Sequence, residues 1–202
     1  MCGVARPDPT WWLRGDAIVG PDGSYPLPSS LPGHAASVNA LFACASAVAM
    51  GVDATKAVSR IAEIENVDGR YAPHQVGPHT VRVLLAKNPA SWTESIATIR
   101  EAAQGSPASS LVLAMAGRGA GGGQDTAMLW DAPFEELAGI AVTTAGSRGD
   151  ELALRLVAAG VPVERGGDDV LAAISAQPPG SVYLVANWPA FNAVLDHIGR
   201  GR

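Results

Sequence analysis

The stretch Ser110–Met115 reads SLVLAM, and the glycine-rich run Gly117–Gly123 follows almost at once. A short, continuous apolar run bounded by turn residues is typical of a strand buried on both faces of a sheet. Similar runs occur at Val81–Ala86 and Ser181–Ala186. A helical pattern over Pro89–Ala102 separates the run Val81–Ala86 from the run Ser110–Met115. Short apolar strands that alternate with helices predict an α/β fold with a parallel sheet.

The alternation continues through the second part of the sequence. Residues 77–202 therefore predict a Rossmann-like domain, with a parallel sheet of five or six strands covered by helices on both faces. Further strands are expected at 140–143 and 161–164, and further helices at 148–159, 168–176 and 189–198.

The first part of the sequence has a different pattern. Residues 1–33 are rich in proline and glycine and predict loops with a short β-ribbon. The alanine-rich run Ser37–Met50 and the run Asp53–Glu65, which has an aspartate at its N-cap position, predict a helical hairpin. The change of pattern places a domain boundary after residue 76, so we expect residues 1–76 to form a separate unit.

The composition of the sequence argues against several classes of protein. A formal net charge of -5, without a basic cluster, does not indicate a nucleic-acid partner. Two cysteines cannot build a disulfide framework, and the sequence begins without a signal-peptide pattern. The most apolar stretch, Ala35–Val52, contains polar residues and is shorter than the roughly twenty residues of a membrane span. These features predict a cytoplasmic protein without a transmembrane segment.

The glycine-rich run matches the G-x-G-x-x-G pattern over Gly117–Gly122. A dinucleotide fingerprint must open a helix and be followed by an acidic residue about twenty positions later. Here Gly123–Asp125 follows without a helix start, which favours a flexible loop over NAD binding. The sequence has no G-x-x-x-x-G-K-[ST] phosphate loop, so any ATP would be held partly by residues outside this chain.

Three strings at expected strand ends resemble, in order, the C-terminal domain of MurT-type members of the Mur ligase family. They are Leu85–Ser91 (LAKNPAS), Gln124–Glu135 (QDTAMLWDAPFE) and Ser147–Leu156 (SRGDELALRL). Upstream, Asp68–Arg70 is similar to the element by which Mur ligases enter that domain. The resemblance implies that residues 1–76 are a C-terminal remnant of the central ATPase domain, including the end of a zinc-ribbon insertion.

The resemblance also implies a function. Such enzymes use ATP and Mg to phosphorylate the α-carboxylate of D-glutamate in lipid II, and ammonia then replaces the phosphate to give D-isoglutamine. A partner glutaminase, GatD, supplies the ammonia with a cysteine and a histidine. The family implies peptidoglycan synthesis at the inner face of the membrane. Without a phosphate loop, the chain alone is expected not to amidate lipid II.

By its position in the family motif, Asp125 is the candidate that completes the glutaminase triad, with Asp131 as second choice. A carboxylate behind the histidine fixes its tautomer and stabilises the imidazolium that forms when the thiol is deprotonated. The alternative is that both aspartates are turn formers, or that Asp131 caps a short helix containing Phe134 and Glu135.

The resemblance gives Lys87, Asn88, Arg70 and Asn39 as candidates for binding the nucleotide or the acyl phosphate. An ammonium group at the carboxyl end of a strand can act as an electrostatic clamp on phosphate. Alternatively, Lys87 is a solvated side chain ahead of a helix that starts with proline, and Arg70 forms a surface ion pair.

Cys2 resembles one ligand of the zinc ribbon that MurT-type proteins carry. Structural zinc takes four ligands, so the missing partners would lie upstream of Met1, and this chain alone is not expected to hold zinc. Cys44 is expected to be buried. The four histidines are too scattered for a metal site, and we expect them in loops or at the surface.

Two other functions stay open. The chain could be a non-catalytic protein-docking module, in which Trp130, beside the aspartate loop, contacts the partner. It could also be a nucleotide-binding α/β domain unrelated to ligation. A sequence encoding the phosphate loop and the missing cysteines just upstream would favour the ligase.

Overall fold

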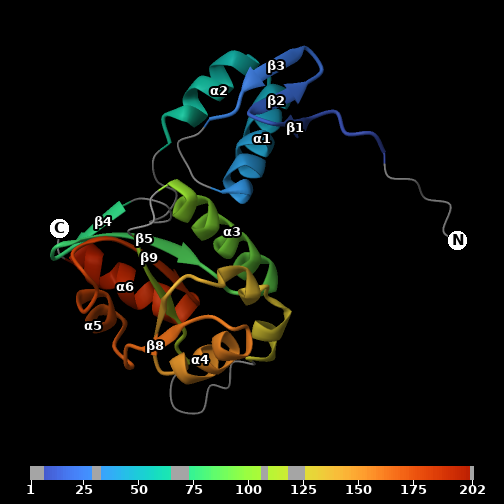
Figure 1. Cartoon of the computed structure of the whole chain (residues 1–202). Coiled ribbons are helices and arrows are strands. Elements are labelled where there is room, and N and C mark those ends of the chain that lie inside the picture. Colours follow the sequence, from blue (N-terminus) through green and yellow to red (C-terminus); the bar gives the residue numbers. More distant parts are fainter. Residues whose placement is uncertain (1–6, 29–32, 65–72, 106–108, 118–125, 201–202) are drawn as a thin grey trace, which may run out of the picture. The chain divides into compact units, whose positions relative to one another are not determined.

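The chain folds into two compact units, Met1–Glu65 and Asn66–Arg202. The predicted boundary after residue 76 differs from this division, because strand β4 (Pro73–Val76) is hydrogen-bonded in the sheet of the second unit. The origin of residues 1–76 in a central ATPase domain remains a prediction. The computed structural model describes residues 7–28, 33–64, 73–105, 109–117 and 126–200 (Figure 1).

In its described residues, the first unit is an antiparallel three-stranded sheet with two helices. The sheet has the order β1-β2-β3, and the predicted β-ribbon and helical hairpin are both present. The side chain of Asp53 accepts a hydrogen bond from Lys56 N at 3.0 Å, as its predicted N-cap role requires. The elements are β1 (Trp12–Arg14), β2 (Ala17–Gly20), β3 (Gly23–Pro26), α1 (His34–Ala49) and α2 (Ala54–Ala62).

The second unit contains a six-stranded sheet of order β4-β5-β9-β6-β7-β8. All neighbouring strands are parallel except β4 and β5, which form an antiparallel hairpin. The predicted α/β fold with a parallel sheet is therefore confirmed. The remaining strands are β5 (His79–Leu85), β6 (Ser110–Ala114), β7 (Val142–Ala145), β8 (Val163–Arg165) and β9 (Gly180–Ala186).

Helices cover both faces of this sheet (Figure 1). Alternate residues of each strand point to opposite faces, so the two faces have separate cores. One core lies under α3, α4 and two 3-10 helices, and the other lies under α5 and α6. These elements are α3 (Pro89–Gly105), η1 (Ala127–Asp131), η2 (Phe134–Leu137), α4 (Gly149–Ala158), α5 (Val170–Ser175) and α6 (Trp188–Arg200).

The hairpin strand β4 was not predicted. Its sequence, PHQV, lacks the apolar alternation of a strand, and it forms by pairing with β5 across a turn in which Gly77 has φ +56°. The pairing buries His74 and leaves His79 only 1% exposed, so the expectation that these histidines lie in loops or at the surface is wrong. No helix in the described part of the chain is long and apolar enough to cross a membrane.

Candidate functional site

The carboxyl ends of the five parallel strands lie at one edge of the sheet. Ligands of open α/β sheets bind where neighbouring strands are followed by elements on opposite faces. Strand β9 is followed by α6 on one face, whereas its neighbours β5 and β6 lead to α3 and η1 on the other. Two such positions therefore flank the carboxyl end of β9.

Asn187, directly after β9, fills the position between β9 and β6. Its side-chain oxygen accepts a hydrogen bond from Ala116 N at 3.0 Å, and its side-chain nitrogen donates to Ala116 O at 2.8 Å. The Asn187 backbone N–H also donates to Ala114 O at 3.1 Å. The residue is 0% exposed. The Asn187 amide satisfies both backbone polar groups of Ala116, as a neighbouring strand would do. It therefore fixes Ala116 in place.

The other side of the β6 carboxyl end is held by the loop after β7. Met115 N donates to Ala145 O at 2.9 Å, and Met115 O accepts from Arg148 N at 2.9 Å. Gly117 N donates to the hydroxyl oxygen of Ser147 at 3.1 Å. Every backbone polar group from Met115 N to Gly117 N is thus hydrogen-bonded, so the segment that leads to residues 118–125 leaves the sheet from a fixed point.

A glycine allows this close approach of loops. Gly146 has φ +90°, and a Cβ atom built on it would lie 2.3 Å from Met115 O. Arg165 ties the same loop to the β8 edge, because its guanidinium donates to Gly146 O at 2.9 Å and pairs with Asp168 and Asp150 at 2.6 Å each. The carboxyl edge between β6 and β8 is therefore a rigid framework.

Lys87 and Asn88 follow β5 at the same edge, as predicted. Asn88 is the N-cap of α3, because its side-chain oxygen accepts from Ser91 N at 2.9 Å. The Ser91 hydroxyl accepts in return from Lys87 N at 2.8 Å and from Asn88 N at 3.0 Å. This reciprocal cap accounts for the asparagine and the serine in the sequence Asn-Pro-Ala-Ser at the start of α3. Lys87 is exposed, and its ammonium group forms no ion pair with any residue that the structure describes.

The structure places the remaining candidate residues unequally. Asp131 is exposed and ends η1. Its alternative role as a helix cap is wrong, because η2 follows Pro133 and has no side-chain cap. Asn39 lies exposed on α1 in the first unit. Asp125, Arg70 and Cys2 lie outside the described residues, so their predicted roles stay predictions.

Arg155 of α4 is a residue that the sequence reasoning missed. It is only 4% exposed, and its Nε and Nη2 are hydrogen-bonded, whereas its Nη1 is buried without a hydrogen-bond partner among the described residues. Its Nε donates to Leu129 O at 3.1 Å, its Nη2 donates to Ala132 O at 2.9 Å, and it pairs with Glu135 at 2.8 Å. A cation inside the apolar pattern of α4 was the signal that could have identified it, because a buried charge requires partners.

Two aromatic rings enclose the same guanidinium. Arg155 Cζ lies 5.2 Å from the ring centroid of Trp130 and 5.4 Å from that of Phe134, within cation–π range. Phe134 is buried, but Trp130 is 60% exposed. A hydrogen bond from its own backbone N–H and the neighbouring Arg155 lower the pKa of the Glu135 carboxyl. The segment from Leu129 to Glu135 is therefore built around one buried cation.

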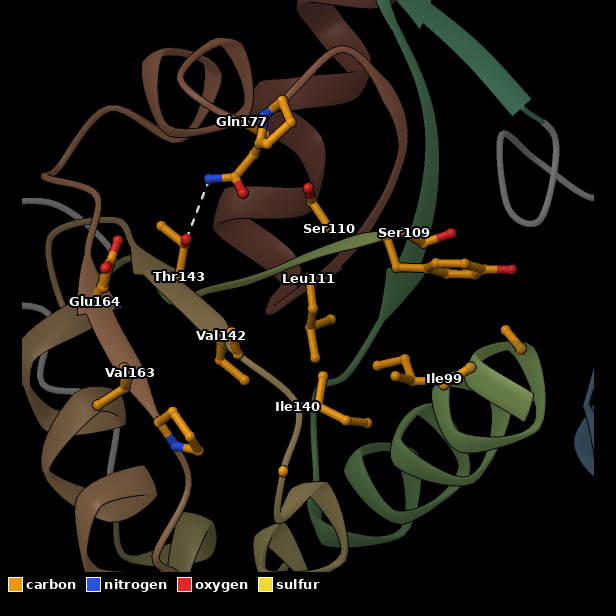
Figure 2. A pocket seen from close by; sticks show the side chains of 17 residues that line it. Ile99, Ser109, Ser110, Leu111, Ile140, Val142, Thr143, Val163, Glu164 and Gln177 are labelled. Carbon is orange, nitrogen blue, oxygen red and sulfur yellow. Dashed lines mark hydrogen bonds between the residues drawn. The ribbon is translucent and has the colours of Figure 1, made fainter. Parts of the chain in front are cut away.

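A cavity of about 830 Å³ lies at the opposite, amino edge of the sheet (Figure 2). Figure 2 shows Ser110, Val142 and Val163, each of which begins a strand, along its wall. A hydrogen bond from Gln177 Nε2 to Thr143 Oγ1, 3.1 Å long, closes one side. Because Lys87 and Gly117 follow the other ends of the strands, this cavity is separate from the candidate site.

Metal binding finds no support in the described part of the chain. No group of three or more histidine, cysteine, aspartate or glutamate side chains there could hold a metal ion. Cys44 is buried in the first unit, as predicted, and burial raises the pKa of its thiol.

Comparison with known proteins gives one family. The family model described as "MurT ligase C-terminal" matches residues 85–191. The subunit MurT of the lipid II isoglutaminyl synthase (glutamine-hydrolyzing) of Streptococcus pneumoniae is 31% identical over 160 residues. That match covers 75% of this chain but only 35% of the relative, so the chain spans about a third of its length.

Solved structures show the same fold at low identity. The ligase MurC of Thermotoga maritima superposes with a TM-score of 0.54 at 15% identity, over 85% of this chain and 39% of that chain. MurF of Acinetobacter baumannii gives 0.57 at 16%, over 91% and 41%. The murein peptide ligase mpl of Psychrobacter arcticus gives 0.56 at 14%, over 95% and 44%. These likenesses concern the fold alone.

Proposed function

Because the chain belongs to the MurT ligase C-terminal family, we propose that it is part of an ATP-dependent amide ligase of peptidoglycan synthesis. The proposed reaction converts the α-carboxylate of D-glutamate in lipid II to the amide of D-isoglutamine. The observation that carries the proposal is the family match over residues 85–191, which begins at the Lys87 loop and contains the whole Asp125–Glu135 segment.

The proposed chemistry has two steps. ATP, with Mg, transfers its γ-phosphoryl group to the carboxylate and leaves as ADP. Ammonia then attacks the acyl phosphate, the new C–N bond forms, and phosphate leaves. Lys87 fits the first step, because its ammonium group is exposed at the carboxyl end of β5 and is free to neutralise phosphate oxygens. Asn88 can offer its amide nitrogen there, since its oxygen is used by the helix cap.

The ammonia is proposed to come from a glutaminase subunit of the GatD type, which hydrolyses glutamine with a cysteine and a histidine. In this proposal Asp125 reaches the partner's histidine and stabilises its imidazolium form, and Asp131 is the second choice. The fixed exit of the segment at Ala116 and Gly117 supports the proposal, because a carboxylate delivered to another protein's active site requires a rigid base.

The remaining predictions for the first unit follow from membership of the same family. We propose that residues 1–76 are the end of the central ATPase domain, that Asn39 and Arg70 lie near the nucleotide, and that Cys2 is one ligand of a zinc ribbon in the complete enzyme. The complete enzyme is proposed to work in the cytoplasm at the inner face of the membrane.

The test uses the ligase with the upstream segment that carries the phosphate loop, co-expressed with the glutaminase. Asp125→Asn keeps the size of the side chain but removes the charge. Glutamine hydrolysis should fall by about four orders of magnitude if the carboxylate completes a triad, while the complex still forms. Asp131→Asn is the matched control. A loss in the Asp131 variant alone would move the role there, and normal rates in both would remove this domain from the chemistry.

The same preparation tests Lys87. Lys87→Met should abolish or strongly reduce amidation of lipid II and leave glutamine hydrolysis unchanged, because the ammonium group acts on phosphate and not on glutamine. Lys56→Met, an exposed lysine in the first unit, is the control. Unchanged amidation in the Lys87 variant would show that this lysine is merely solvated.

A further inference from the structure

Trp130 is the most unusual exposed side chain of the second unit. It is 60% exposed, although η1, on which it lies, packs against the core under α3 and α4. A large aromatic ring left in water forgoes the stabilisation that burial would provide. Its inner face rests on the guanidinium of Arg155, with Cζ 5.2 Å from the ring centroid.

Arg155 makes this exposed ring rigid. Its hydrogen bonds to Leu129 O and Ala132 O fix the backbone on both sides of Trp130. Burying a cation has a high desolvation cost, and an apolar residue at this position would often stabilise the core as well or better. An apolar residue could not donate the hydrogen bonds that hold Trp130 in its exposed position. Rigid tryptophans at exposed positions are the side chains on which protein interfaces depend most.

We propose that Trp130 is a preorganised anchor on which the glutamine-hydrolysing partner subunit docks. This inference rests on the proposed function, in which Asp125 enters the partner's active site. Asp125 and Trp130 are five residues apart, so their Cα atoms lie within about 18 Å of each other in any conformation. A standard interface covers about 800 Å² per partner, which is a disc of about 16 Å radius. A partner that receives Asp125 near the centre of its interface therefore covers Trp130 or borders it.

The charges beside Trp130 describe the partner's surface. Three carboxylates follow it within six positions: Asp131, Glu135 and Glu136. Glu135 pairs with Arg155 and Glu136 pairs with Arg100, whereas Asp131 forms no ion pair with any described residue. Asp131, next to Trp130 in the chain, is therefore the one of these three carboxylates whose charge no described residue compensates. The matching surface is an apolar pocket with a lysine or arginine side chain placed to meet Asp131.

The test measures binding of the 202-residue chain to the glutaminase subunit of the same organism by calorimetry. Trp130→Ala should weaken binding by about thirtyfold or more, as expected for an interface hot spot. Trp188→Ala is the matched control: Trp188 is 41% exposed and stacks on Phe191 of α6, on the opposite face of the sheet, so its loss should change affinity less than threefold. Asp131→Lys should weaken binding, because it places a positive charge opposite the partner's lysine or arginine.

The outcomes separate the two proposals. If the unchanged chain does not bind the glutaminase, the proposed function fails in its partner and the inference fails with it. If the unchanged chain binds and the Trp130 and Trp188 variants bind equally well, the proposed function stands and the anchor is wrong. Light scattering completes the test: a dimer of this chain that dissociates only in the Trp130 variant, with glutaminase binding unaffected, would assign the surface to a second copy and overturn the inference. Thermal unfolding of each variant checks the fold.

Discussion

Both backbone polar groups of Ala116 are hydrogen-bonded to one side chain, the amide of Asn187, which lies 71 positions further along the chain. The two residues follow neighbouring strands, so the amide continues the pairing of β6 with β9 beyond the last backbone hydrogen bond. One of the two positions where this open α/β sheet could admit a ligand, the one between β9 and β6, is therefore closed by protein, whereas the other lies between β9 and β5. In the proposed function, the segment that leaves at Gly117 acts on the partner subunit and not on a ligand held between β9 and β6.

Asn187→Ala should destabilise the protein markedly. The substitution leaves the N–H and C=O of the half-buried Ala116 without their side-chain partner, and an unsatisfied group costs about 1–3 kcal/mol when it is fully buried. The free energy of unfolding, measured with urea, should therefore fall by about 2–4 kcal/mol, in the lower part of the range for two such groups. Gln177→Ala is the control, because it removes amide hydrogen bonds of a partly buried residue at the opposite sheet edge. A loss below about 1 kcal/mol in the Asn187 variant would contradict the closed position.

Gly146→Ala should be among the most damaging glycine substitutions. The new Cβ would lie 2.3 Å from Met115 O at a φ of +90°, so strain and a steric clash act together. Gly160→Ala has a similar φ of +72° but nothing within 4 Å of the new atom. The Gly160 variant should lose about 1 kcal/mol of stability and the Gly146 variant several times more, measured by thermal unfolding. Equal losses would show that the loop after β7 can move away from Met115.

The pair of Glu135 and Arg155 predicts a dependence of stability on pH. Folding lowers the pKa of Glu135, so its contribution is fully present above the ordinary glutamate pKa of about 4.3 and is lost as the pH falls through the lower folded value. The difference in melting temperature between the unchanged chain and Glu135→Gln should stay constant from pH 7 to about 5 and shrink below about 4. Glu101→Gln, at an exposed glutamate of α3, is the control. A difference that persists at low pH would contradict an ionic contribution.

The thiol of Cys44 should be unreactive in the folded chain. It is fully buried, and burial raises its pKa, so little thiolate is present and reagents cannot reach it. A Cys2→Ser variant leaves Cys44 as the single thiol. Reaction with a chromogenic disulfide at pH 8 should be negligible before denaturation and complete in guanidinium. Rapid labelling of the folded protein would indicate that α1 opens easily.

The repeating part of the fold could be predicted from the sequence because it depends on local pattern. Each parallel strand is buried on both faces and reads as an unbroken apolar run, as in Ser110–Ala114. The strand β4 gave no such signal, since Pro73–Val76 is a strand only through its pairing with β5. The burial of His79 follows from that pairing and could not be predicted without it.

The candidate site divides in the same way. Lys87 and Asn88 were predicted at the carboxyl edge because they directly follow a recognisable strand. Asn187 and Ser147 were missed, because their importance comes from contacts with Ala116 and Gly117, which follow a strand distant in sequence. Arg155 was missed for the same reason, since the carbonyls it binds lie more than twenty positions before it.

The place of β9 between β5 and β6 has a consequence for how the domain is made. Strand β6 pairs with β7 and β9, and β5 pairs with β4 and β9, so nothing in the sheet joins the β4–β5 hairpin to β6 until β9 is present. During synthesis, the edges of β5 and β6 that face β9 therefore stay unpaired until residue 186 has emerged from the ribosome. Non-local pairing of this kind slows folding and leaves unpaired strands open to aggregation. Nascent chains of this domain should therefore depend on chaperones more than chains whose central strand is made first.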